Sequence, residues 1–154
     1  MTQGKDHGSG TEKAAEKGRR ASPALLLAAW LVPGLGHWLR GKRLPALVFC
    51  LVVLAAFATG VLVDGELGTP KIGSPFSWLA TFACLGNGML YLIRLLWVNG
   101  LGGLFSSAFP FGLSGGGDPV AAGFTYGNTF LYTAGLMNLL AVLDVSDIAR
   151  GLKE

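Results

Sequence analysis

Charged side chains are scarce in this sequence, and their scarcity argues against a water-soluble domain. Asp, Glu, Lys and Arg make up 14% of the 154 residues, whereas soluble domains average about 25%. Hydrophobic residues reach 51%, and the mean hydropathy is +0.52. The apolar residues come in long blocks and do not alternate with polar residues. The composition therefore indicates an integral membrane protein.

Residues that carry metal or redox chemistry are also few. The chain has two cysteines and two histidines. Cys50 and Cys84 both fall inside apolar blocks, which argues against a disulfide framework or a zinc site, since either needs more ligands or an oxidising aqueous setting. His37 is the one histidine beside a membrane segment, so haem ligation would depend on it alone. We therefore expect no metal, no cofactor and no enzymatic activity.

What the sequence does have is one clear membrane span at residues 44–63. These twenty residues, LPALVFCLVVLAAFATGVLV, contain no charge and form a helix of about 30 Å, the thickness of the hydrocarbon layer. A basic cluster precedes the span and two acidic residues follow it, namely Arg40, Lys42 and Arg43, then Asp64 and Glu66. The net charge of +3 is better explained by membrane orientation than by nucleic acid binding. The basic cluster is also expected to attract anionic lipid headgroups.

An earlier apolar block, residues 21–39, is barely long enough to span a membrane. Pro33 and Gly34 would weaken its helix near the C-terminal end. Basic residues flank both ends, which is awkward for a segment that crosses the bilayer. A short re-entrant helix removes the conflict, and a full span stays open as the alternative.

The segment that follows carries a family resemblance. Residues 33–43, PGLGHWLRGKR, resemble the hairpin of the two-transmembrane-helix domain, with matching positions at Gly34, Gly36, His37, Trp38 and Gly41. The whole chain, with YGNTF at 126–130 and LDVSDIA at 143–149, is similar to a family of small bacterial multi-pass membrane proteins of unknown function. The resemblance implies a bacterial cytoplasmic (inner) membrane location and no particular chemistry.

Two further spans are expected, at residues 76–98 and 126–143. Each has a stripe of small and polar side chains at three- and four-residue spacing, which should face protein rather than lipid. The stripes are Ala80, Cys84, Asn87, Tyr91 and Arg94 in the first, and Gly127, Leu131, Ala134, Asn138 and Ala141 in the second. We expect Asn87 and Asn138 to lie at comparable depth and to be able to bond to each other. For Arg94, near a helix end, we expect snorkelling to the interface, with a lipid headgroup or another subunit as the alternative partner.

The remaining segments are expected outside these spans. Residues 1–20 read as a disordered polar tail. Residues 99–125, rich in glycine and phenylalanine, are either a tolerant linker or a segment that lies on the membrane or on a partner. Asp144 and Asp147, just past the last span, are expected to form a solvated helix end.

These observations predict an all-α membrane bundle over residues 21–154, with three clear transmembrane helices and one short or re-entrant N-terminal helix. The expected function is that of a non-enzymatic subunit, or an assembly or interaction factor, of a larger membrane complex. Its partners would be the bilayer and a membrane protein or a second copy. A small oligomeric transporter or channel component is the alternative, and an enzyme acting on lipid headgroups through His37, Arg40 and the two acids, Asp144 and Asp147, is the third possibility.

Overall fold

A computed structural model describes residues 22–70, 72–101 and 117–152 of the chain. In these ranges every regular element is a helix, as the apolar blocks predict. The predictions for the N-terminal tail 1–20 and for residues 102–116 of the glycine and phenylalanine loop concern residues outside the described ranges.

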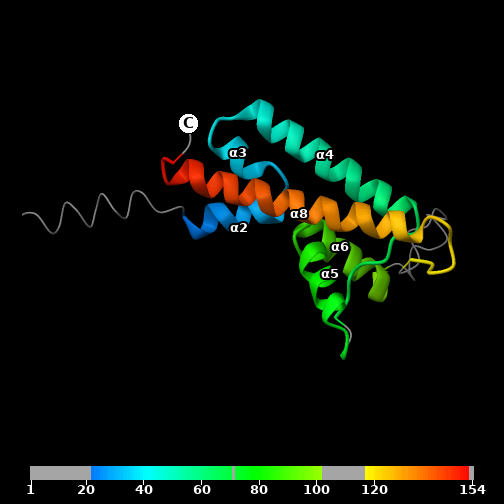
Figure 1. Cartoon of the computed structure of the whole chain (residues 1–154). Helices are drawn as coiled ribbons and strands as arrows, with labels where there is room; N and C mark the ends of the chain where they lie inside the picture. The colour runs from blue at the N-terminus through cyan, green and yellow to red at the C-terminus, as the bar shows by residue number, and fades with distance from the viewer. Residues whose placement is uncertain (1–21, 71, 102–116, 153–154) are drawn as a thin grey trace, which may run out of the picture.

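Two long helices form the axis of the molecule. Helix α4 covers Arg43–Leu62 and helix α8 covers Phe124–Ala149, and the two pack along each other (Figure 1). They approach closely where Gly60 faces Leu131 and the carbonyl oxygen of Gly127, and Gly127 also meets the backbone of Gly65 in the loop after α4. Small residues allow this close helix contact. Helix α8 extends well beyond the predicted span at 126–143, so its end carries Asp144 and Asp147 as part of the helix.

The first apolar block folds as two short helices. Helix α2 covers Pro23–Leu31 and helix α3 covers Leu35–Leu39. The chain turns at Gly34, whose φ of 82° is a left-handed conformation that glycine adopts without strain. The nine residues of α2 give about 13 Å, less than half of a bilayer crossing. Figure 1 shows α3 turning back toward the side from which α2 began, so the block folds as a short helical hairpin, and whether it is re-entrant in the membrane stays a prediction.

The predicted span at 76–98 is the main correction to the sequence-based fold. It is divided into α5, Pro75–Leu85, and α6, Met89–Leu96, which continues into a π-helical turn, η1, at Trp97–Leu101. The two directions differ by 112°. The break falls at three weak helix formers, Gly86, Asn87 and Gly88, and the last has a φ of 58°. Figure 1 shows α5 and α6 meeting against α8 and leading away from it.

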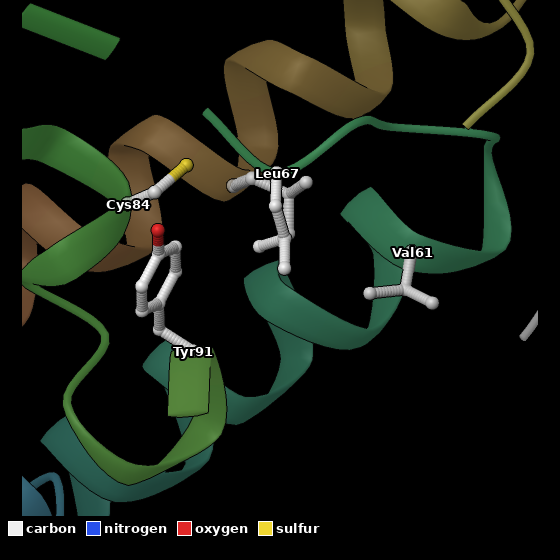
Figure 2. Packing of buried hydrophobic residues seen from close by; sticks show 5 residues of the cluster. Val61, Leu67, Cys84 and Tyr91 are labelled. Atoms are coloured by element: carbon white, nitrogen blue, oxygen red, sulfur yellow. The ribbon is translucent and has the colours of Figure 1, made fainter. Parts of the chain in front are cut away.

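A small apolar core joins α4, the α5–α6 pair and α8. It consists of Val61, Leu67, Cys84, Tyr91 and Leu131. Figure 2 shows Tyr91 with its hydroxyl directed toward Cys84 and toward the chain segment that carries Leu67. That hydroxyl donates to the carbonyl oxygen of Gly68 over 3.3 Å. The core therefore ties the loop after α4 to the broken helix.

Length and composition make α4 and α8 suitable for crossing a membrane. The α5–α6 pair is a third crossing only if the bent pair counts as one span. Many large apolar side chains on these helices are exposed, Leu51 and Leu54 of α4 and Leu140 of α8 among them. Such exposure suits a lipid environment. The predicted count of three clear spans is thus two or three.

Candidate functional site

The polar side chains predicted to face the interior meet at the break between α5 and α6. Asn138, in the middle of α8, donates from Nδ2 to the carbonyl oxygens of Gly86, over 2.8 Å, and Trp30, over 2.9 Å. The indole N–H of Trp30 in turn donates to the carbonyl oxygen of Leu85 over 3.0 Å. The end of α2, the break and the middle of α8 are thereby joined. We call this set, with Asn87, the central junction.

Asn87 supplies the second amide of the central junction. Its Nδ2 donates to the carbonyl oxygens of Cys84, over 3.1 Å, and Leu131, over 3.0 Å. Asn87 and Asn138 are both fully buried. The predicted bond between the two amides is wrong, because each amide nitrogen donates to backbone carbonyls instead. The carbonyl of Gly86 follows the end of α5, where carbonyls lack partners within the helix.

Glycines allow the backbones to meet at this place. A Cβ on Gly135 of α8 would overlap the carbonyl oxygen of Ala83, and a Cβ on Gly86 would overlap the carbonyl of Gly135. A Cβ on Gly88 would overlap the carbonyl oxygen of Trp30. Glycine at these three positions therefore lets the backbones come close enough for the asparagine side chains to bridge them. The predicted stripes do face the interior: Cys84, Leu131 and Ala134 are fully buried.

A second polar contact joins the re-entrant hairpin to α8. His37 of α3 is 2% exposed, and its Nε2 lies 2.9 Å from Oδ2 of Asp144. A carboxylate only accepts hydrogen bonds, so the imidazole is the donor. The His37 ring also stacks on Phe49 of α4, with ring centroids 5.0 Å apart. Asp144 is expected from the sequence only as part of a solvated helix end; its side chain keeps 30% of its surface exposed, and the chain fold also brings His37 to it.

The other hairpin residues have separate structural roles. Gly34 lies against the backbone of Ala46, and Gly36 against the side chains of Ala29 and Val145. Trp38 and Arg40 are exposed, as are Gly41 and Arg43, while Lys42 is half-buried. The Arg43 guanidinium lies 5.8 Å from the centroid of the Trp38 ring, a cation–π distance. The basic cluster is therefore largely accessible to anionic groups.

Arg94 does not behave as predicted. Its side chain is 5% exposed, so it does not snorkel to the surface. It lines a cavity of about 470 Å³ between α4 and α6, together with Phe57, Val61, Ile93 and Trp97. The burial follows from the break at Gly86–Gly88, which turns α6 and directs its polar face toward α4.

Some acceptor atoms of these groups have no hydrogen-bond partner among the described residues. They are His37 Nδ1 and the Oδ1 atoms of Asn87 and Asn138, all buried. In the same described ranges, no three His, Cys, Asp or Glu side chains cluster as metal ligands would. The central junction is best described as a set of donors that complete a broken helix.

Fold and site together define a class: an α-helical protein with two or three helices long and apolar enough to span a membrane, and with interrupted helical segments joined by buried amides. The chain belongs to the family of unknown function DUF6677, which it matches over residues 24–154. This confirms the predicted resemblance to a family of unknown function. No curated protein and no solved structure matches the chain.

Sequence reasoning found the members of the site and missed how they combine. Asn87 and Asn138 were identified as buried amides, and His37 as the motif histidine. The contact between His37 and Asp144 joins residues 107 positions apart, which no local pattern reveals. One signal in the sequence was that apolar residues continue past Asp144 to Val145, which suggests that the helix stays packed there. In the structure Val145 is 1% exposed.

Proposed function

We propose that this protein is a non-catalytic membrane subunit that binds another integral membrane protein laterally through α5. Helix α5 is held mainly at its C-terminal end, where Ala83 and Cys84 are buried. The rest of it is apolar and open: Phe76 is 81% exposed, Trp78 52%, Leu79 67% and Phe82 63%. Large aromatic and aliphatic side chains on a fixed helix are what a packed interface uses as anchors.

The observation that carries this proposal is the way the central junction fixes α5. The carbonyls of Cys84, Leu85 and Gly86 at the end of α5 accept from Asn87, Trp30 and Asn138 respectively. Two of these bonds come from other helices, Trp30 of α2 and Asn138 of α8, so the direction of α5 is set before any partner binds. A preorganised helix loses little conformational entropy on association, which favours binding.

The bend supports a protein neighbour over lipid alone. Two helices that differ in direction by 112° cannot both follow the bilayer normal. At least one of them lies steeply tilted, and its end carries backbone groups that hydrocarbon cannot satisfy. The start of α5, at Pro75 and Phe76, is exposed. A neighbouring membrane protein that covers this end would provide the missing surroundings.

Site-specific photocrosslinking in native membranes tests the proposal. A photoreactive amino acid replaces Leu79 on α5 in one variant and Leu51 on α4, which is 58% exposed, in the control. We expect one defined protein adduct from position 79 and only lipid adducts from position 51. The absence of a protein adduct at 79, or equal adducts at both positions, would contradict the proposal. An adduct of twice the chain mass would replace the partner with a second copy.

A second candidate function, a small oligomeric transporter or channel component, is favoured by one observation. Broken helices that lie near the bilayer midplane form substrate sites in many transporters, and the Oδ1 atoms of Asn87 and Asn138 are buried acceptors without a partner in the described ranges. Replacing both asparagines with leucine in reconstituted vesicles distinguishes the candidates. A transporter would lose flux entirely, whereas a subunit would keep its crosslink at position 79 with lower stability.

A further inference from the structure

A narrow apolar groove lies between the hairpin of α2 and α3 and the first turns of α4. Its volume is about 240 Å³, which is below the range of about 300 to 1,000 Å³ that small-molecule sites occupy. No charged side chain lines it, and α4 contributes Ala46, Leu47, Cys50 and Leu51 to its walls. The size and lining of the groove therefore suit part of one hydrocarbon chain.

The groove begins near the membrane surface and continues into the hydrocarbon region. Arg43 is the first residue of α4, and the uncharged span begins directly after it. The groove residues Ala46 to Leu51 lie about 5 to 12 Å further along the helix axis. Leu47 is 53% exposed and Leu51 is 58% exposed. The groove is therefore open sideways, so a lipid can enter it without leaving the bilayer.

The basic cluster, Arg40, Lys42 and Arg43, lies outside the groove, and one of its members is held at the rim. Trp38 lines the groove and is 52% exposed. The Arg43 guanidinium lies 5.8 Å from the centroid of the Trp38 ring. A guanidinium over an aromatic face keeps the N–H donors of its edge for other partners. Trp38 therefore places a cation where lipid headgroups reach it.

The charges of the basic cluster are available to an anion. Arg40 and Arg43 are exposed, and Lys42 is half-buried. In the described part of the chain, none of the three forms an ion pair with a carboxylate. The first turn of α4 contains no acidic residue either. Uncompensated cations beside an apolar groove complement a molecule that has an anionic head and a hydrocarbon chain.

We propose that this groove binds one anionic phospholipid, with its phosphate at Arg43 and one acyl chain between the hairpin and α4. The planar guanidinium matches two oxygens of a phosphate group, and the other two bases add to the attraction. A basic cluster alone attracts any anionic lipid to the membrane surface. The groove beside it fixes one lipid at one place, so that this lipid stays bound when the bilayer is removed.

Lipid retention measured by native mass spectrometry tests the proposal. The full chain is reconstituted in bilayers of phosphatidylcholine that contain a small share of phosphatidylglycerol, then released into mild detergent. Leu47→Trp fills the groove, and its control is Val48→Trp, because Val48 is 55% exposed on the same turn and does not line the groove. Arg43→Gln removes the cation at the rim. Its control, Arg150→Gln, removes the same charge from an exposed position after α8, at the same end of the molecule (Figure 1).

We expect about one phosphatidylglycerol per wild-type chain, and a several-fold loss in both Leu47→Trp and Arg43→Gln. Val48→Trp and Arg150→Gln should retain as much as the wild type. Wild-type retention in Leu47→Trp would overturn the proposal, as would equal retention of phosphatidylcholine. Equal losses in the two arginine variants would assign retention to net charge. Equal losses in the two tryptophan variants would assign it to a general disturbance of α4, and either result would also overturn the proposal.

Discussion

The two long helices and the two interrupted segments of this protein are built on different principles. Helices α4 and α8 satisfy their backbone groups internally, and pack through glycine contacts such as Gly60 with Leu131. The segments α2–α3 and α5–α6 are broken at glycines, and side chains from elsewhere bond to them: His37 with Asp144, and the carbonyl oxygen of Gly86 with Asn138. Apolar length alone forms a span, whereas a break inside a membrane domain needs specific polar partners.

The largest expected effect is in the labelling of single cysteines, which reports the side of the membrane on which the ends of α2–α3 and the loop after α4 lie. If α2–α3 is re-entrant, Ser22 and Arg40 lie on one side of the membrane, and Ile72, after α4, lies on the other. We expect Ser22→Cys and Arg40→Cys to react with an impermeant maleimide from the same side, and Ile72→Cys to react only from the opposite side. All three positions are exposed. Labelling of positions 22 and 40 from opposite sides would show that the block crosses the membrane.

A smaller effect is expected from removing the donor that completes the second break. Asn138→Leu leaves the carbonyls of Gly86 and Trp30 without their bonds, and an unsatisfied buried acceptor costs about 1 to 3 kcal/mol. Unfolding in mixed micelles should show this loss. The matched control is Asn99→Leu, since Asn99 is exposed and donates only to Leu95, one turn earlier. Equal losses for the two variants would show that the junction bonds do not hold the broken helix.

The smallest effect is expected at the contact between the hairpin and α8. Asp144→Asn keeps the shape of the acceptor and removes its charge, and the Asp144 side chain is 30% exposed, so we expect a loss of less than about 1 kcal/mol. Asp147→Asn, three residues along the same helix, is the control and should change little. In a His37→Phe background, the effect of Asp144→Asn should disappear. If it persists unchanged, His37 is not the partner that matters.

The sequence-based predictions succeeded where the cause is local. The span predicted at 44–63 corresponds to α4 at Arg43–Leu62, because hydropathy and length suffice for a helix without breaks. The stripes of small and polar residues were also correct, since the spacing of side chains on a helix is fixed. The turn at Gly34 follows from the same kind of local information.

Predictions that depend on tertiary contacts failed or stayed open. Gly86 and Gly88 were visible inside the segment 76–98, but one or two glycines do not break a membrane helix unless a neighbour bonds to the freed carbonyls. Asn138 is that neighbour, and it comes from a helix 52 residues further along the chain. The wrong pairing of Asn87 with Asn138 has the same origin: burial was predictable, but the choice of acceptor was not.

Helix α8 has a consequence for the order in which the protein is made. The interrupted segments leave the ribosome before α8 does, yet the groups that complete them, Asn138 and Asp144, belong to α8. Until the last helix is inserted, the break at Gly86 and the imidazole of His37 lie in the membrane without these partners. The early helices can therefore reach their final arrangement only after synthesis of α8, and assembly of this domain is a late event in which α8 joins segments already in the bilayer.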